Sequence, residues 1–436
     1  MASSTILVLS KSDYTEQTVL SLPSPSVPDS HALPQSTVLV RTTIIALTTN
    51  NLSYARGGST LHWWSTYPVP SSLPEPYNSS STYGIVPAWG YGTILASSIP
   101  GLQPNTILWG YFPVSTLPVP LLLKQSPGGA IGHWIEHSPH REKVMSLYQR
   151  YVVHSASSLV NPGSLVLDKL AWRALIYPLW ECGYLLNRFV FPQDQSTAAA
   201  LHPSGTHLSW PSSSSDLTNA LVILLAASSK TALCFAQQLK YTRNQDLTSP
   251  LAVIGVTSES SPPFARDTHC FDDMLLYTDL QATLPVLLAT AREKCLSHVV
   301  VLDFGGRNAA DQKLYAALAA AQPPIPTTMI GVGAEPKVLT AAERTAIEAQ
   351  NTSIGKVRMN TSNLRAAAIE LLGEQAYFDD VEAKWSEFLE AGGVAGIKLR
   401  WGEGMEGEDG VGAAWMALCG REGTRVQPDE GMVFRL

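Results

Sequence analysis

Charged side chains are scarce in this sequence. They make up 15% of its 436 residues, against about a quarter in an average globular domain. The net charge is −7, and no segment clusters lysine and arginine. Because proteins that bind nucleic acids present grouped basic residues to the phosphates, we expect no nucleic-acid partner.

Long apolar runs and paired cysteines are also missing. No stretch approaches the roughly 18 consecutive apolar residues of a membrane span. The N-terminus, MASSTILVLSKSD, has neither the basic segment nor the apolar length of a secretory signal. An odd, scattered set of cysteines is typical of a reduced protein, so we expect a cytoplasmic protein with no membrane segment. The five cysteines are Cys182, Cys234, Cys270, Cys295 and Cys419.

A metal site lacks its usual ligands. No cysteine precedes Cys182, and the nearest histidine group is His133, His137 and His140. No carboxylate accompanies them as in the HExxH pattern of zinc enzymes. Solvated or locally hydrogen-bonded histidines explain this spacing more simply. The sequence therefore predicts no metal.

The residues that are present follow two patterns, and the length suits two domains. Residues 1–155 hold short apolar or alternating runs separated by proline, serine and glycine, which predicts the strands of a barrel or sandwich. From residue 217, apolar β-branched strands alternate with helices, which is typical of a parallel, doubly wound sheet. A linking helix is expected over 165–190. The glycine-rich segment 398–420 is expected to form loops with a closing strand.

The segment LVILLAASSKTALCFAQQL (221–239) has the pattern of a buried strand, a short turn and a helix. Dinucleotide-binding proteins place a glycine-rich phosphate loop at such a turn, and here the glycines are missing. A relaxed spacing of small residues survives at Ala226, Ser229 and Ala232. The N–H groups that open the helix still favour an anion. The side chains predicted to complete a phosphate site are Ser228, Ser229, Lys230 and Thr231.

A second interpretation of this turn needs no ligand. Serine and threonine are ordinary helix N-caps, and Lys230 can be a solvated surface charge. The phosphate loop of nucleoside triphosphatases is excluded, because Leu224 and Ser229 stand where its two glycines are required. Phosphate binding and simple capping remain alternatives of equal weight.

The two strand ends that follow also carry polar residues. The first ends at Ser258, where an NAD enzyme normally has an acidic residue for the ribose. With Arg266 in the next helix, this uncharged end favours the 2′-phosphate of NADP(H), and the alternative is a solvated Arg266. The strand HVVVLDFGG (298–306) ends at an edge where open α/β sheets bind ligands. We predict that Asp303 and Gly305 lie beside the cofactor, although Asp303 can equally cap its own loop.

The order of these segments resembles a known superfamily. The segments that carry the resemblance span most of residues 36–306 and are NNLSYARGG, PAWGYGTILAS, GYFPVS, HREKVMSLYQRYVV, LLAASSKTA, VIGVTS and VLDFGG. Their order resembles the zinc-free medium-chain dehydrogenase/reductase superfamily. It is more similar still to a fungal and bacterial family of unknown function that is usually called dehydrogenase-like. The segments PLWECGYLLNRF and SESSPPFARD depart from the family pattern.

The resemblance implies an α/β fold of two domains. One is a GroES-like β-rich substrate domain over residues 1–165, joined by the tail 365–436. The other is a Rossmann-type doubly wound parallel sheet over residues 166–364. It also implies a cleft between them with an NADP(H) pocket, and a homodimer is common in the superfamily. Since many fungal members belong to secondary metabolism, the implied substrate is a small natural product.

The same resemblance places residues 50–54 in the loop that enters the cleft. A zinc-free reductase needs a proton donor near the substrate. We expect Tyr54 to supply that proton and the amide of Asn51 to orient the substrate. The alternative for Tyr54 is a packed ring with a bonded hydroxyl. Three nearby aromatic residues that could line an apolar pocket or belong to the core are Trp63, Trp64 and Tyr67.

Three functions are open at this point. The first is a zinc-independent, NADP(H)-dependent reductase of a carbonyl or enone in a polyketide-like secondary metabolite. The second is a redox-neutral isomerase, lyase or cyclase in natural-product biosynthesis, on a dehydrogenase fold that has lost cofactor binding. The third is a non-catalytic binding protein. A serine hydrolase is disfavoured, because the sequence has no GxSxG motif.

Overall fold

The structure is a computed structural model. It describes residues 3–154, 164–194, 200–243, 248–259, 262–335, 341–420 and 426–436. Its internal contacts divide the chain into two units. The first consists of Met1–Pro178 and Lys398–Leu436, and the second of Leu179–Ile397. Each unit has a hydrophobic core of its own, as a domain requires.

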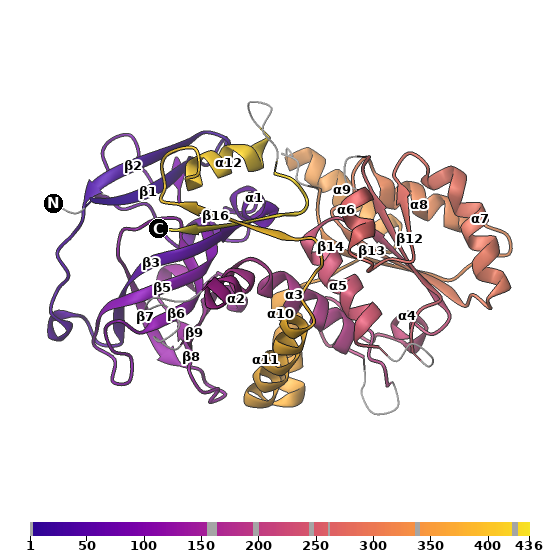
Figure 1. Cartoon of the computed structure of the whole chain (residues 1–436), viewed down its shortest axis with the longest axis horizontal. Coiled ribbons are helices and arrows are strands. Elements are labelled where there is room, and N and C mark those ends of the chain that lie inside the picture. Colours follow the sequence, from indigo (N-terminus) through magenta and orange to yellow (C-terminus); the bar gives the residue numbers. More distant parts are fainter. Residues whose placement is uncertain are drawn as a thin grey trace. The chain divides into compact units, whose positions relative to one another are not determined.

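The first unit is built on an antiparallel barrel. The sheet that contains it has the strands β3 (Thr37–Leu47), β5 (Pro87–Ser97), β6 (Ile107–Pro113), β7 (Val119–Gln125), β8 (His133–Glu136), β9 (Arg150–His154), β16 (Lys398–Glu403) and β17 (Glu430–Arg435). Among the described residues their order is β16-β17-β3-β5-β6-β9-β8-β7 (Figure 1). The first half of β3 also pairs with β7, while its second half pairs with β17. This extra pairing closes six of the strands into a ring and leaves the ring without an open edge.

Smaller elements complete this unit. They are β1 (Ser3–Ser10), β2 (Gln17–Pro23), β4 (Tyr83–Gly84), α1 (Thr49–Arg56), α2 (Ser164–Leu175) and α12 (Val411–Cys419). The first three form a sheet in the order β2-β1-β4. Alternating residues of β1 and β3 point inward, so that Ile6 and Val8 meet Val38 and Val40 in one core.

The second unit contains a parallel sheet. Its strands are β10 (Ala220–Leu225), β11 (Ala252–Thr257), β12 (Asp273–Leu276), β13 (His298–Phe304), β14 (Thr327–Gly333) and β15 (Val357–Arg358). Within the described residues they run in the order β12-β11-β10-β13-β14-β15, and every pairing is parallel. Counted from β10, this order is 3-2-1-4-5-6, the order of the dinucleotide-binding fold.

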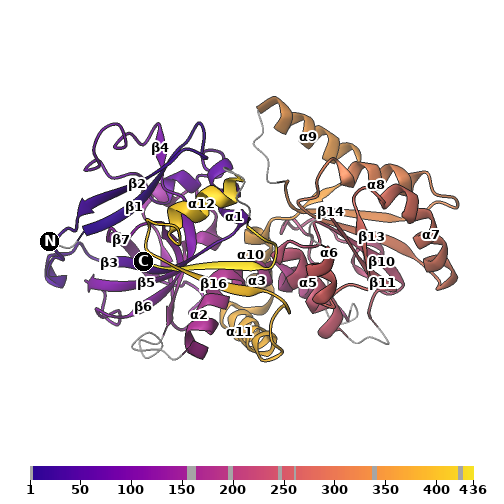
Figure 2. The same ribbon diagram turned by 45° about the horizontal axis from the view of Figure 1, so that its top comes forward.

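Helices cover both faces of this sheet. The helices of this unit are α3 (Tyr177–Leu185), which crosses the unit boundary, α4 (Ser212–Ser215), α5 (Lys230–Tyr241), α6 (Pro262–Asp267), α7 (Leu280–Glu293), α8 (Ala310–Ala319), α9 (Ala341–Ser353), α10 (Thr361–Leu372) and α11 (Glu374–Glu390). Leu221, Ile223 and Leu225 of β10 pack with Leu284 of α7 and Leu314 of α8. Figures 1 and 2 show α7 and α8 on one side of the sheet and α5 on the other. Burial from both sides explains why β10 is apolar at every position.

The observed architecture confirms the predicted fold class. It is an α/β protein with a GroES-like β-rich unit and a Rossmann-type, doubly wound parallel sheet. None of the described helices combines the length and the apolarity needed to cross a bilayer.

The unit bounds differ from the domain bounds expected from the sequence. α2 lies within the first unit, where it packs on β3, β5 and β17. α11 and most of α10, which the sequence assigned to the returning tail 365–436, lie in the second unit. They are held to α3 by Glu181, which pairs with Arg365 Nε at 2.9 Å and accepts from Tyr377 Oη at 2.8 Å. Helical periodicity does not reveal such partners, so the sequence alone could not assign these helices.

The glycine-rich segment 398–420 holds more regular structure than expected. It forms β16 and also α12, so the expectation of a loop is wrong for Val411–Cys419. Trp415 explains the helix, because its side chain is fully buried and its Nε1 donates to the carbonyl of Tyr14 at 2.8 Å. That partner lies about 400 residues away in sequence, beyond the reach of a local pattern.

The buried pair between Arg365 and Glu181 makes stability testable. Arg365→Ala leaves the Glu181 carboxylate buried without its cation, and we expect the free energy of unfolding to fall by about 3–5 kcal/mol. The measurement is urea unfolding followed by tryptophan fluorescence. Lys384→Ala is the control: it removes an exposed pair on α11 and should change stability by less than about 0.5 kcal/mol. Equal effects of the two variants would contradict this account.

Candidate functional site

The turn after β10 lies at the carboxyl edge of the parallel sheet. Ala226 leaves the strand with a φ of +56°, in the left-handed region that favours glycine. Its N–H donates to the hydroxyl of Tyr277 at 2.9 Å. The N–H of Ala227 donates to the carbonyl of Val256 at 3.1 Å. Ala226 therefore makes the tight turn of the missing first glycine, at a conformational cost of about 1 kcal/mol.

Two serine hydroxyls of this turn serve the fold. Ser229 is the N-cap of α5, and its Oγ accepts from the N–H of Ala232 at 3.4 Å. Ser228 Oγ lies 3.1 Å from Thr257 Oγ1 at the end of β11. The capping alternative is therefore observed for Ser229, and Ser228 ties the turn to the neighbouring strand.

The first turn of α5 presents the remaining predicted groups. Lys230 and Thr231 are its first two residues, and both are half-exposed. The helix dipole concentrates positive potential there, so an anion at this end would also meet their ammonium and hydroxyl groups. Behind them the helix packs closely, because Ala232 is fully buried. A Cβ on Gly255 of β11 would lie only 2.9 Å from the Cβ of Ala227. Glycine at position 255 therefore allows Ala227 to lie close to β11.

The loop after β13 is held by Asp303. Its Oδ1 accepts from the N–H groups of Gly305 at 2.9 Å and Gly306 at 2.6 Å, so Asp303 caps its own loop. Its Oδ2 lies 2.5 Å from Lys356 Nζ, which also contacts Asp311 Oδ2 at 2.8 Å. Burial acts to lower the pKa of Lys356, but the two carboxylates outweigh it and raise that pKa above its ordinary value. Lys356 therefore keeps its charge, and its contacts with the two carboxylates fix the loop.

The strand ends meet at the switch point between β10 and β13. Gly305 adopts a φ of +116°, and a Cβ on Gly306 would lie 3.1 Å from the Cβ of Leu225. The turn residues, Ser258 and the glycine loop thus share one edge of the sheet. Ser258 is half-buried at the end of β11, whereas Arg266 lies exposed on α6.

Two residues of this edge were not predicted from the sequence. Tyr277 follows β12. Its hydroxyl accepts from the N–H of Ala226, and its own N–H donates to the carbonyl of Thr257 at 3.1 Å. Burial raises the pKa of its phenol. The segment DMLLY could have predicted the position of Tyr277, because it is a fourth strand that ends at this edge of the parallel sheet. Lys356 precedes a strand of only two residues, which no periodicity reveals.

Asn51 lies in a helix rather than in a loop. Its Oδ1 accepts from the N–H of Thr48 at 2.8 Å, in a capping box that starts α1. Its Nδ2 donates to the carbonyl of Pro87 at 3.0 Å. Both ends of the amide are therefore used within the first unit, and a substrate would have to replace one of these bonds.

Tyr54 lies in an aromatic cluster of the same unit. It is 4% exposed, and its hydroxyl accepts from Trp89 Nε1 at 3.1 Å and from Asn50 Nδ2 at 3.4 Å. Burial raises the pKa of Tyr54 to about 12. The phenol thus keeps its proton at neutral pH. The rings that contact it edge-on are Trp63, Tyr111 and Tyr148.

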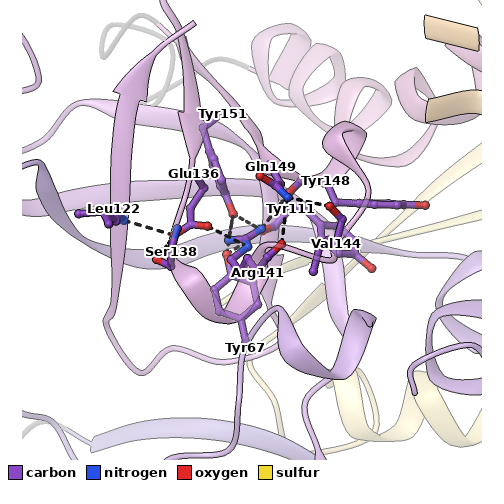
Figure 3. A network of polar contacts seen from close by, with 10 residues as sticks. All are labelled: Tyr67, Tyr111, Leu122, Glu136, Ser138, Arg141, Val144, Tyr148, Gln149 and Tyr151. Atoms are coloured by element: carbon purple, nitrogen blue, oxygen red, sulfur yellow. Dashed lines mark hydrogen bonds and ion pairs between the residues drawn. The ribbon is translucent and has the colours of Figure 1, made fainter. Parts of the chain in front are cut away.

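A second polar network lies in the barrel around Arg141 (Figure 3). Arg141 Nε pairs with Glu136 Oε2 at 3.2 Å, and both side chains are 1% exposed. Nη1 donates to Tyr151 Oη at 3.0 Å. Tyr151 Oη in turn lies 2.7 Å from Tyr67 Oη, and both hydroxyls lie 2.7 Å from the carbonyl of Tyr111. Burial acts to lower the pKa of Arg141, but Tyr151, Tyr67 and Glu136 raise it, so the guanidinium is always charged.

The histidine group does not converge on one point. His133 is buried with its Nδ1 3.2 Å from Arg150 Nη1, whereas His137 and His140 are exposed. In the part of the chain that the structure describes, no three histidine, cysteine or acidic residues are arranged to hold a metal ion.

The environment of Tyr54 predicts a pH dependence. Its pKa rises from 10 to about 12 on folding, so its contribution to stability is complete below pH 10 and is lost as the pH rises to 12. In Tyr54→Phe this loss is absent. Between pH 10 and 12 we expect the variant's unfolding free energy to fall less steeply than that of the wild type, by roughly 1 kcal/mol per pH unit. Urea unfolding at several pH values measures the slopes.

A control and a contrary result accompany this test. Tyr241→Phe removes an exposed phenol and controls for the loss of a tyrosine. At pH 8, Tyr54→Phe should be about 1–2 kcal/mol less stable than the wild type, because Trp89 loses its acceptor. Identical slopes for Tyr54→Phe and the wild type would show that the phenol is not desolvated in the folded protein.

Solved structures with a similar fold include CurA and 2-enoyl thioester reductases. CurA from Vibrio vulnificus matches 100% of this chain and 98% of its own, with a TM-score of 0.54 and 12% identity, and it has also been solved with NADPH. The complex of Etr1p with NADP and crotonyl-CoA matches 100% of both chains, with a TM-score of 0.53 and 11% identity. The mitochondrial 2-enoyl thioester reductase Etr1p/Etr2p heterodimer from Candida tropicalis gives the same values. At such identities the likeness establishes the fold.

The sequence comparisons assign the family. No curated protein matches the chain. Residues 45–424 match a family described as Protein of unknown function (DUF2855). That match covers most of the chain and confirms the resemblance drawn from its segments. The chain therefore belongs to the DUF2855 family, whose fold resembles that of the medium-chain dehydrogenase/reductase superfamily.

Proposed function

We propose that this protein is an NADP(H)-dependent reductase that works without zinc on a carbonyl or enone of a secondary metabolite. The observation that carries the proposal is the position of Lys230 and Thr231. They open a helix at the switch point of a sheet with the order 3-2-1-4-5-6, where this fold binds dinucleotides. Similar folds solved with NADPH or NADP, in CurA and Etr1p, support the choice of cofactor.

The residues at the sheet edge fit a phosphate-bearing ligand. In the proposed complex the first turn of α5 holds the pyrophosphate, and Lys230 and Thr231 replace the contacts of the missing glycines. The uncharged Ser258 and the cationic Arg266 suit the 2′-phosphate. Asp303 keeps the loop at Gly305 in place through its two backbone bonds. When bound, the nicotinamide supplies or accepts the hydride.

The proposed proton donor is Tyr54. Its raised pKa keeps the phenol protonated at neutral pH, which suits a group that gives a proton rather than one that removes it. Asn51 has a positioning role in this scheme. Its capping box and its bond to Pro87 fix the helix that carries Tyr54.

Nucleotide binding tests the cofactor proposal. We expect NADPH to bind with a micromolar Kd, measured by calorimetry and by quenching of tryptophan fluorescence. Lys230→Met should weaken NADPH and NADH alike, by about tenfold or more, because one charge-assisted phosphate contact is lost. Arg266→Met should weaken NADPH selectively, because only NADPH carries the 2′-phosphate.

The matched control for this test lies on the same helix. Lys240→Met removes a lysine near the other end of α5, where Nζ pairs with Asp272 at 3.0 Å, and it should bind both nucleotides as the wild type does. If neither nucleotide binds the wild type, the reductase proposal fails.

One observation favours a redox-neutral function as the second candidate. Ala226 carries a Cβ at the tight turn, and the hydroxyls of Ser228 and Ser229 are engaged within the protein. This edge of the sheet therefore offers a phosphate fewer hydrogen-bond donors than a glycine-rich loop does. In this alternative an isomerase, lyase or cyclase would convert its substrate without a nucleotide.

Turnover separates the two candidates. We expect the protein to oxidise NADPH, followed at 340 nm, when it is offered cyclic and open-chain enones. Tyr54→Phe should lower kcat by about 10²-fold, the usual share of general acid catalysis, and leave the Kd for NADPH unchanged. Tyr241→Phe, which removes an exposed phenol, should retain full activity. Conversion of an enone without NADPH would favour the redox-neutral candidate, and full activity of Tyr54→Phe would refute its role as donor.

A further inference from the structure

A cavity of about 310 Å³ lies in the first unit, whereas the proposed cofactor residues belong to the second. Its walls are mostly apolar and rich in proline, which offers no N–H donor. Representative lining residues are Ile6, Ile85, Leu121, Pro68, Pro118 and Pro120. Two of them, Pro68 and Pro120, are exposed, as is His140 beside them. The cavity is therefore reached from solvent.

Buried polar side chains also line this cavity. They are Thr66, Tyr67, Glu136 and Arg141, each less than 6% exposed. Figure 3 shows Tyr67, Glu136 and Arg141 lying together. A small pocket with apolar walls and a few buried polar groups is the usual construction of a ligand site.

Thr66 has a hydroxyl that the protein does not use. Its side chain is fully buried, and no atom of the described residues forms a hydrogen bond with its Oγ1. The neighbouring Tyr67 differs, since its hydroxyl is bonded to Tyr111 and Tyr151. Buried hydroxyls are normally paired. The hydroxyl of Thr66 is therefore the group that a bound molecule would satisfy.

The charges at the cavity balance each other. Glu136 and Arg141 form an ion pair at 3.2 Å, and Arg141 also lies over the ring of Tyr67, 5.2 Å from its centroid. An anionic ligand would compete with Glu136 for the guanidinium, and a cationic one would compete with Arg141 for the carboxylate. Either would also lose its hydration among apolar walls. The pair therefore favours an uncharged ligand.

We propose that this cavity binds an uncharged, mainly apolar small molecule that carries one hydroxyl group. The hydroxyl bonds to Thr66 Oγ1, and the body packs against the prolines. Since a water molecule takes about 30 Å³ in the liquid, the volume suits roughly ten non-hydrogen atoms. Binding requires no nucleotide, so this site stands whether or not the reductase proposal holds.

Three matched probes test the site on the full chain without nucleotide. They are 2-naphthol, naphthalene and 2-naphthoate, which share one ring system and differ in the polar group. We expect 2-naphthol to bind about tenfold more tightly than naphthalene, as one satisfied hydrogen bond allows, and 2-naphthoate to show no saturable binding. Calorimetry and probe fluorescence give the three affinities.

The variant that locates the binding is Thr66→Val. It keeps the branched shape and removes only the hydroxyl, so 2-naphthol should bind it no better than naphthalene does, while naphthalene binding stays unchanged. Its unfolding temperature should not fall, because no protein bond is lost, and this checks that it folds. Thr290→Val, exposed on α7, is the control and should leave the preference intact.

Three results would overturn the proposal. If no probe shows saturable binding, the cavity holds water only. If all three probes bind alike, the polar residues do not select the ligand. If Thr66→Val keeps the preference for 2-naphthol, the probe binds elsewhere on the protein.

Discussion

The burial of β10 between β11 and β13 is the constraint on which the second unit depends. Parallel strands satisfy their backbone groups through their neighbours and bury their side chains on both faces. Polar chemistry is then possible only where the strands end. Because β10 begins a 3-2-1-4-5-6 order, the strands that follow it are added first on one side of β10 and then on the other. The helix that follows β10 therefore starts at the switch point, where this fold binds ligands. The left-handed turn at Ala226 and the loop held by Asp303 both follow from this geometry.

Two of the ion pairs of this protein are buried. Glu136 with Arg141 in the barrel, and Glu181 with Arg365 in the helices, each lie below 10% exposure. Removing ions from water is costly unless each one has a partner and further hydrogen bonds. Tyr151 and Tyr377 supply those bonds. Such networks bind together segments that are distant in sequence, and they place tyrosine hydroxyls at fixed points.

Local pattern was sufficient for most elements and for their order along the chain. The apolar run of β10, the serine that caps α5, and the alternation of strands with helices are short-range properties with a physical cause. They led to the parallel sheet and to the position of Lys230 and Thr231 at a helix start. The same patterns did not predict the helix α12, whose buried tryptophan bonds to a distant residue. They also placed α10 and α11 in the wrong unit, because the partner Glu181 lies on another helix.

By itself the sequence determined the fold class, because periodicity and the alternation of strands with helices are properties of neighbouring residues. Only the tertiary structure decided what each polar side chain does. Asn51 serves a capping box, Asp303 holds its own loop, Ala226 meets Tyr277 from 51 positions away, and Thr66 faces a cavity. The physical reason is that a hydrogen bond depends on a partner within about 3 Å. Which partner comes that close is set by the packing of distant segments, and that packing is not visible in any local pattern.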